Sequence, residues 1–166
     1  QNNRLRYWRR WIDRESIQKL LTDSEFSHLA RNAQVLSFDI DGNDAHFVSD
    51  LLESGVRPLL WIQEYNAVIP PHASWTIEYN PTHKWKKDNY MGASLQCLVS
   101  IFKQHEYSPV ACSVTGANVF FIRNDKMHLF ADCPTSVEDL YVRPLHFLQN
   151  RWGHKMSPQF VESLLR

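Results

Sequence analysis

Two short acidic strings, FDIDGND at 38–44 and IQEYN at 62–66, carry the residues of this sequence best suited to chemistry. Each string begins within the last residues of an apolar, β-rich run and continues beyond it. Such a position is typical of a buried strand that meets a loop. The carboxyl ends of neighbouring parallel strands share one cleft, so the acids of the first string should lie there beside Glu64 and Asn66. Carboxylate and amide oxygens are the ligands that Mg²⁺ and Ca²⁺ prefer. The spacing therefore predicts a cation site.

The first string also has a purely structural interpretation. Asp41 and Gly42 can form a turn while Asp44 caps the following helix, which leaves one acid facing the cleft. The string resembles the opening of a calcium loop, but Asp50 stands where that loop needs its closing glutamate if Asp39 is first. We reject the calcium loop and leave the cation site and the structural interpretation open.

A long polar and aromatic stretch, residues 66–89, exceeds the usual length of a loop in a compact domain and is typical of a lid or binding loop. Aromatic rings there can stack on a sugar or a planar ring, or can anchor the loop to the domain. His46, in the helix after the first string, is a candidate proton acceptor, although a packing role is commoner for a histidine. The candidate substrate-binding residues of the loop are His72, Trp75, Tyr79 and Trp85.

Apolar periodicity and turn residues predict the elements that position these groups. A βαβ unit is followed by a helix and an antiparallel hairpin, which indicates an α/β fold with helices on both faces of the sheet. The predicted strands are 34–40, 58–64, 107–113 and 117–123, and the predicted helices are 13–21, 44–55, 93–105 and the last eight residues.

Composition excludes several classes of protein. The 166 residues include 18 basic and 18 acidic ones, so no net charge draws the chain to nucleic acid. No apolar run approaches the ~20 residues that span a bilayer, and we expect no membrane partner. Three cysteines without a CxxC pair favour a reducing, cytoplasmic setting. The arginines that crowd the start are interpreted as a solvated basic edge: Arg4, Arg6, Arg9, Arg10 and Arg14.

Four strings in a fixed order resemble one known family. They are FDIDGND at 38–44, IQEYN at 62–66, YMGASL at 90–95 and TGANVFF at 115–121. Over about residues 6–125 they resemble the second half of bacterial proteins related to the FkbM-type sugar and polyketide O-methyltransferases. The resemblance implies that these strings end the fourth strand, end the fifth strand, open the next helix and form the closing hairpin. It implies a partial Rossmann-like methyltransferase sheet at 1–125, with 126–166 as an extension packed on the same domain.

The same resemblance implies an activity and its residues. The reaction would be S-adenosylmethionine-dependent O-methylation of a hydroxyl on a small molecule or glycan. Mg²⁺ would be held by Asp39, Glu64 and Asn66, as in catechol-type relatives, and Asp39 would be catalytic. His46 is a second catalytic candidate because of its position in the helix after the first string. Such a cation lowers the pKa of the acceptor hydroxyl that it binds.

The chain departs from the family at its start. None of its five glycines follows a strand in a GxG arrangement near the N-terminus, where the cofactor loop belongs. Residues 6–11 should be the third strand, so the cofactor half is missing and we expect S-adenosylmethionine to bind weakly or not at all. A non-catalytic binding or interaction domain is the alternative. The apolar edge of such a partial sheet should be covered by self-association or by a companion chain.

Overall fold

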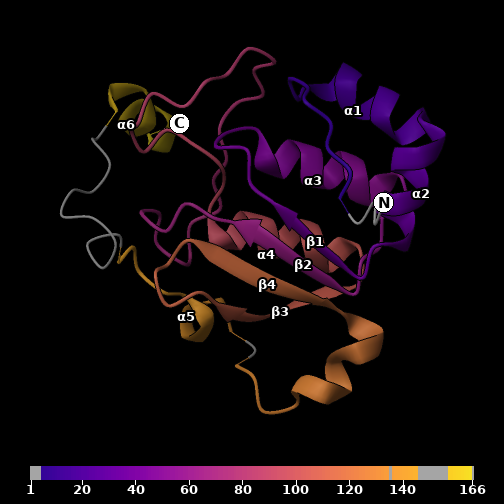
Figure 1. Cartoon of the computed structure of the whole chain (residues 1–166). Coiled ribbons are helices and arrows are strands. Elements are labelled where there is room, and N and C mark those ends of the chain that lie inside the picture. The colour runs from indigo at the N-terminus through magenta and orange to yellow at the C-terminus, as the bar shows by residue number, and fades with distance from the viewer. Residues whose placement is uncertain (1–4, 135, 146–156, 166) are drawn as a thin grey trace.

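One mixed sheet forms the centre of the described chain, and helices flank it. The computed structural model describes residues 5–134, 136–145 and 157–165 (Figure 1). The helices are α1 (Arg14–Thr22), α2 (Ser24–Asn32), α3 (Asp44–Glu53), α4 (Leu95–Gln104), α5 (Val137–Leu140) and α6 (Pro158–Leu164), with a 3-10 helix η1 (Asn124–Phe130). The strands are β1 (Val35–Phe38), β2 (Leu60–Glu64), β3 (Tyr107–Cys112) and β4 (Asn118–Arg123).

The four strands confirm the strand positions expected from the sequence, and the chain has an α/β fold. β1 pairs in parallel with β2, and β4 pairs antiparallel with both β2 and β3. The strand order is β1-β2-β4-β3. The predicted hairpin of β3 and β4 is confirmed, and its second strand is inserted into the sheet rather than added at the edge. β3 therefore runs in the same direction as β1 and β2.

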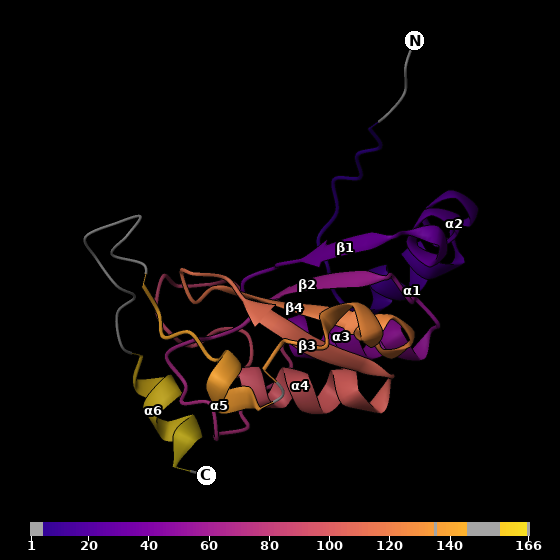
Figure 2. The same cartoon turned by 90° about the horizontal axis from the view of Figure 1, so that it is seen from below.

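α3 and α4 bury apolar residues at helical spacing against one face of the sheet. Phe102 of α4 lies 5.3 Å from Trp61 of β2, between ring centroids, and stacks on Phe121 of β4 at 3.8 Å. Figure 2 places both helices on the same side of the sheet, whereas the sequence predicted helices on both faces. Leu60 and Ile62 alternate with Trp61 along β2 and point to the opposite face, where they are half-buried.

Aspartates set the ends of the first two helices. Asp13 begins α1 through a reciprocal capping box with Ser16. Asp23 ends α1, and its side chain accepts hydrogen bonds from the backbone of Glu25 and Phe26, so it begins α2. The sequence analysis did not predict α2, because its apolar residues are few.

Residues 6–11, which the sequence analysis placed in a third strand, have no regular secondary structure, so that prediction is wrong. Most of their side chains are exposed, and the run lacks the buried face that stabilises a strand. Trp8 packs edge-on against Phe26 of α2, with ring centroids 5.8 Å apart. We call residues 5–12 the N-terminal arm.

The long stretch of residues 66–89 folds around a second, smaller apolar cluster, formed by Ile69, Trp75, Ile77, Tyr90 and Phe160. Phe160 comes from α6, and the Trp75 indole donates a hydrogen bond to Ser163 in the same helix at 2.9 Å. α6 thus holds the loop in place. The predicted C-terminal extension is described in part, because residues 146–156 lie outside the described residues. Among the residues described, no helix is long and apolar enough to cross a membrane.

Candidate functional site

Three carboxylates meet at the carboxyl ends of β1 and β2. Asp39, Asp41 and Glu64 each offer an oxygen within 4.8 Å of the other two. The strand pairing explains this arrangement, because Phe38 lies beside Gln63 and the next residues of the two strands are therefore neighbours. Asp41 reaches the same place through a turn in which its own φ is 55°. The sequence predicted that Asp39 and Glu64 meet, and it assigned Asp41 to the turn alone.

Glu64 is the least exposed member of this carboxylate cluster and is partly buried. Burial, followed by the negative charges of Asp39, Asp44 and Asp41, raises the pKa of Glu64 to about 9. Its Oε2 atom is buried and has no hydrogen-bond partner. Without a cation, Glu64 is therefore protonated at neutral pH. Either a proton or a cation must neutralise charge at this point, since ionised acids at such short distances repel each other.

Asp44 stabilises the turn between β1 and α3, and the prediction that it caps α3 is wrong. The helix begins at Asp44 itself, after Asn43. The Asp44 carboxylate accepts hydrogen bonds from the backbone N–H of Gly42 at 2.9 Å and of Ile40 at 3.2 Å. Gln63 of β2 donates a third at 3.3 Å. Burial raises the pKa of Asp44 to about 6, and the backbone hydrogen bonds oppose that shift.

The side chain of Asn66 binds the backbone of the long loop and is not part of the carboxylate cluster. Its buried side-chain amide donates to the carbonyls of Asn89 and Met91 at 2.9 and 3.0 Å. Its oxygen accepts a hydrogen bond from the backbone of Val68 at 3.2 Å. These bonds join the two ends of the long loop. Asn66, which the sequence predicted to be a cation ligand, therefore uses its side chain to close the loop. Asp41, and not Asn66, lies beside Asp39 and Glu64.

The candidate histidines also differ in their surroundings. His46 makes a 2.9 Å hydrogen bond through Nε2 with the carbonyl of Ile77, which ties α3 to the long loop. Its ring packs edge-on against Tyr79, with centroids 5.6 Å apart. His72 is exposed on the loop. His46 thus has a packing role in this structure, and neither histidine belongs to the carboxylate cluster.

Of the four predicted substrate-binding residues, Tyr79 and Trp85 line a cavity of about 480 Å³ in the long loop. Trp85 donates its indole N–H to the carbonyl of Asp88 at 2.7 Å. Trp75 is buried in the second apolar cluster and does not line this cavity. The cavity has aromatic and charged walls, which also include Glu78, His83, Lys84, Lys86 and Tyr90.

Hydrogen bonds and one packing contact hold the long loop against the acidic turn, residues 41–43. Asn43 donates to the carbonyl of Asn80 at 2.8 Å, and Asn80 N–H donates to the Asn43 side-chain oxygen at 3.1 Å. His83 packs so closely on Gly42 that a Cβ at residue 42 would overlap its ring. These contacts place a wall of the cavity next to the turn that carries Asp41.

His83 is a residue that the sequence analysis missed. Burial lowers its pKa, while a hydrogen bond with the Asp41 backbone opposes that shift. Its Nε2 atom is buried and has no hydrogen-bond partner. Gly42 was the available signal, because a glycine directly after a strand indicates that another group approaches the backbone closely. The approaching group, 41 positions away, could not be identified from the sequence.

Comparison with protein-family models, with curated proteins and with solved structures finds no match to this chain.

Proposed function

We propose that this chain is the cation- and acceptor-binding part of a Rossmann-like O-methyltransferase that acts on a hydroxyl of a small molecule or glycan. The observation that carries the proposal is the meeting of Asp39, Asp41 and Glu64 at the ends of two neighbouring parallel strands. Open α/β sheets bind their ligands at this position.

The positions of the four strings support the family resemblance. The acidic strings follow β1 and end β2, and Ser94 of the GASL string caps α4. The TGANVFF string forms the turn and first half of β4.

The carboxylate cluster has the chemistry of a site for a small divalent cation. Its donors are hard oxygens, and Glu64 Oε2 lacks a hydrogen-bond partner that would compete for it. Asp39, Asp41 and Glu64 would hold Mg²⁺. A bound Mg²⁺ supplies a positive charge that lowers the pKa of a coordinated hydroxyl. The protein's part is to present three oxygens, and the neighbouring cavity would hold the rest of the acceptor.

We do not assign S-adenosylmethionine to the described residues. The glycines with positive φ are Gly55 after α3, Gly92 before α4 and Gly116 in the hairpin. None of them follows a strand in a glycine-rich loop next to the acids. Our proposal therefore confines this chain to binding the cation and the acceptor.

A non-catalytic binding domain is the second candidate, and one observation favours it. His46, Trp75 and Asn66 all hold the loop and the domain together rather than facing a ligand. A domain of this kind would bind its ligand in the loop cavity without ionising it.

The two functions can be separated with 4-nitrocatechol, a phenol whose visible absorption changes when its hydroxyl ionises. Our proposal expects the chain with Mg²⁺ to produce the phenolate band at a lower pH than Mg²⁺ alone. Asp39→Asn should abolish that effect, and Asp132→Asn, an exposed acid of a distant segment, should retain it. Binding of the probe without a change in its ionisation would favour the non-catalytic domain.

A further inference from the structure

The two edges of the sheet differ in their protection against pairing with another strand. β3 forms one edge and contains Pro109, with a register shift between Pro109 and Ala111 that interrupts regular pairing. β1 forms the other edge and has the sequence VLSF, without proline or charge. The Gln34 carbonyl accepts from Leu60 N–H, so the backbone groups of the odd-numbered residues of β1 point outward. The β1 edge can therefore accept a further strand.

An apolar groove of about 430 Å³ runs beside the β1 edge. Side chains from the arm, from α1 and α2, and from β1 itself form its walls. They include Trp8, Phe26, Leu29, Leu36 and Phe38. A groove of this composition lies next to the outer edge of β1, opposite β2, and suits an extended segment with apolar side chains.

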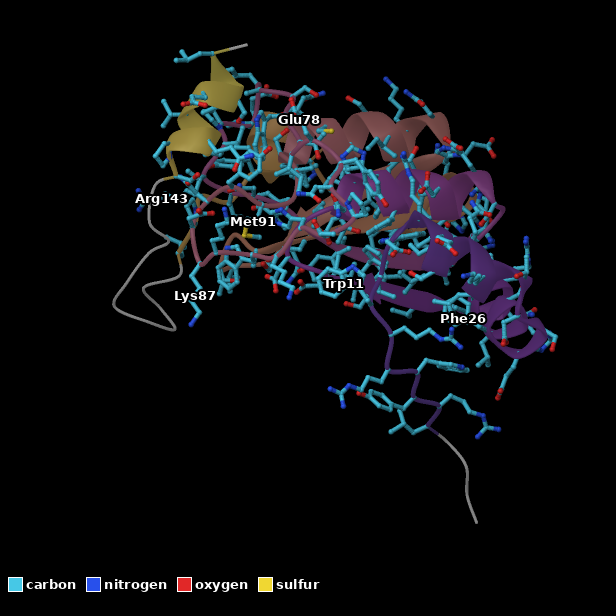
Figure 3. The ribbon with its side chains drawn as sticks, turned by 90° about the horizontal axis from the view of Figure 1, so that it is seen from above. Trp11, Phe26, Glu78, Lys87, Met91 and Arg143 are labelled. Carbon is cyan, nitrogen blue, oxygen red and sulfur yellow. The ribbon has the colours of Figure 1, made fainter. Side chains whose placement is uncertain are left out.

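The N-terminal arm is such a segment, and two of its apolar side chains are largely exposed. Trp8 and Arg6 attach the arm to α2, the latter through a 2.6 Å ion pair with Glu25. Leu5 and Tyr7 lie on either side of Arg6 and are 83% and 79% exposed. Figures 2 and 3 show the arm projecting away from the sheet, beyond Trp11.

Charge also favours the arm as the occupant of the groove. The arm carries Arg6, Arg9 and Arg10, and Asp39 and Asp41 follow the end of β1. An arm that runs parallel to β1 would bring its arginines toward this acidic end and set Leu5 and Tyr7 along the apolar strand. Opposite charges aligned in this way select one direction of pairing.

We propose that two copies of this chain exchange the exposed first part of their N-terminal arms, residues 5–7, each pairing with β1 of the other copy and entering its groove, while Trp8 and Ile12 stay in the wall of their own groove. The contact is reciprocal, so it closes at a dimer with two-fold symmetry. It covers the β1 edge, which has no strand partner among the residues that the structure describes.

Light scattering coupled to size exclusion tests this proposal. The chain should be a dimer at 100 µM, and the double variant Leu5→Asp with Tyr7→Asp should associate at least tenfold more weakly. The matched control carries Val114→Asp and Leu129→Asp, which replace residues that are 78% and 68% exposed elsewhere, and it should remain a dimer. High salt should also weaken the dimer, because the paired charges are exposed.

A second pair of measurements distinguishes arm exchange from direct pairing of two β1 edges. Val35→Lys changes an edge residue that is 54% exposed and should weaken the dimer while the circular dichroism spectrum stays unchanged. Mixing the Leu5/Tyr7 variant with Val35→Lys should restore association. The intact arm of Val35→Lys can then pair with the intact β1 edge of the Leu5/Tyr7 variant. A monomeric chain, or a Leu5/Tyr7 variant that remains a dimer, would overturn the proposal.

Discussion

The buried proton on Glu64 makes a quantitative prediction about stability and pH. The pKa of Glu64 is about 9 in the folded chain, whereas an unfolded glutamate titrates near about 4.3. Because the folded value is the higher one, this contribution to stability is complete below about pH 4 and is lost as the pH rises through about 9. Between these values the folded state binds one more proton than the unfolded state. The free energy of unfolding should therefore fall by about 1.4 kcal/mol per pH unit.

Urea unfolding in metal-free buffer at pH 7.5, 8.0 and 8.5 measures this slope above the range where most histidines titrate. Glu64→Gln keeps the neutral shape of the protonated acid and should remove the contribution of Glu64 to the slope, which makes the variant the more stable protein at pH 8.5. The slope that remains near pH 8.5 comes from Cys97 and Cys112, whose pKa burial also raises. Glu138→Gln, an exposed change in α5, should preserve the slope. Mg²⁺ should stabilise the parent chain at pH 8.5, because it replaces the proton. Equal stability of the parent chain at all three pH values would refute our account of Glu64.

Three further predictions follow from the fold and the turn. Calorimetry should detect no micromolar binding of S-adenosylmethionine, because each missing hydrogen bond to a buried ligand group costs about 1–3 kcal/mol. Asp44→Ala should lower the free energy of urea unfolding by more than the ~1 kcal/mol typical of a lost cap, because it leaves the backbone of Gly42 and Ile40 without its acceptor. Gly116→Ala should destabilise the chain by about 1–3 kcal/mol in the same assay, because residue 116 has a φ of 68° and a Cβ there would overlap the Arg143 carbonyl.

The sequence predicted those features that depend on local patterns. Period-two and helical apolar spacing located β1, β2, α3, α4 and the hairpin. The meeting of Asp39 and Glu64 also followed, because it requires only that two strand ends be neighbours in a parallel pair. The insertion of β4 between β2 and β3 could not be predicted, because no local pattern distinguishes that order from an edge hairpin.

The remaining features of the site depend on contacts between distant segments. The side-chain amide of Asn66 donates hydrogen bonds to the carbonyls of Asn89 and Met91. The sequence does not show that the end of the long loop returns to Asn66. Asp44 points back to Gly42 because the turn places Asp41 at positive φ, a conformation that tertiary packing fixes. Residues 6–11 were assigned to a third strand from their place in the family pattern, and that pattern could not show that Trp8 packs against α2 instead.

Calorimetric titration of MgCl₂ into the chain at pH 8 is the most direct test of the central claim, that Asp39, Asp41 and Glu64 form one cation site. We predict saturable binding of one Mg²⁺ per chain, with affinity at least about tenfold weaker in Asp39→Asn and Glu64→Gln and unchanged in Asp132→Asn. Absence of saturable binding, or equal affinity in the parent chain and Asp39→Asn, would contradict the claim.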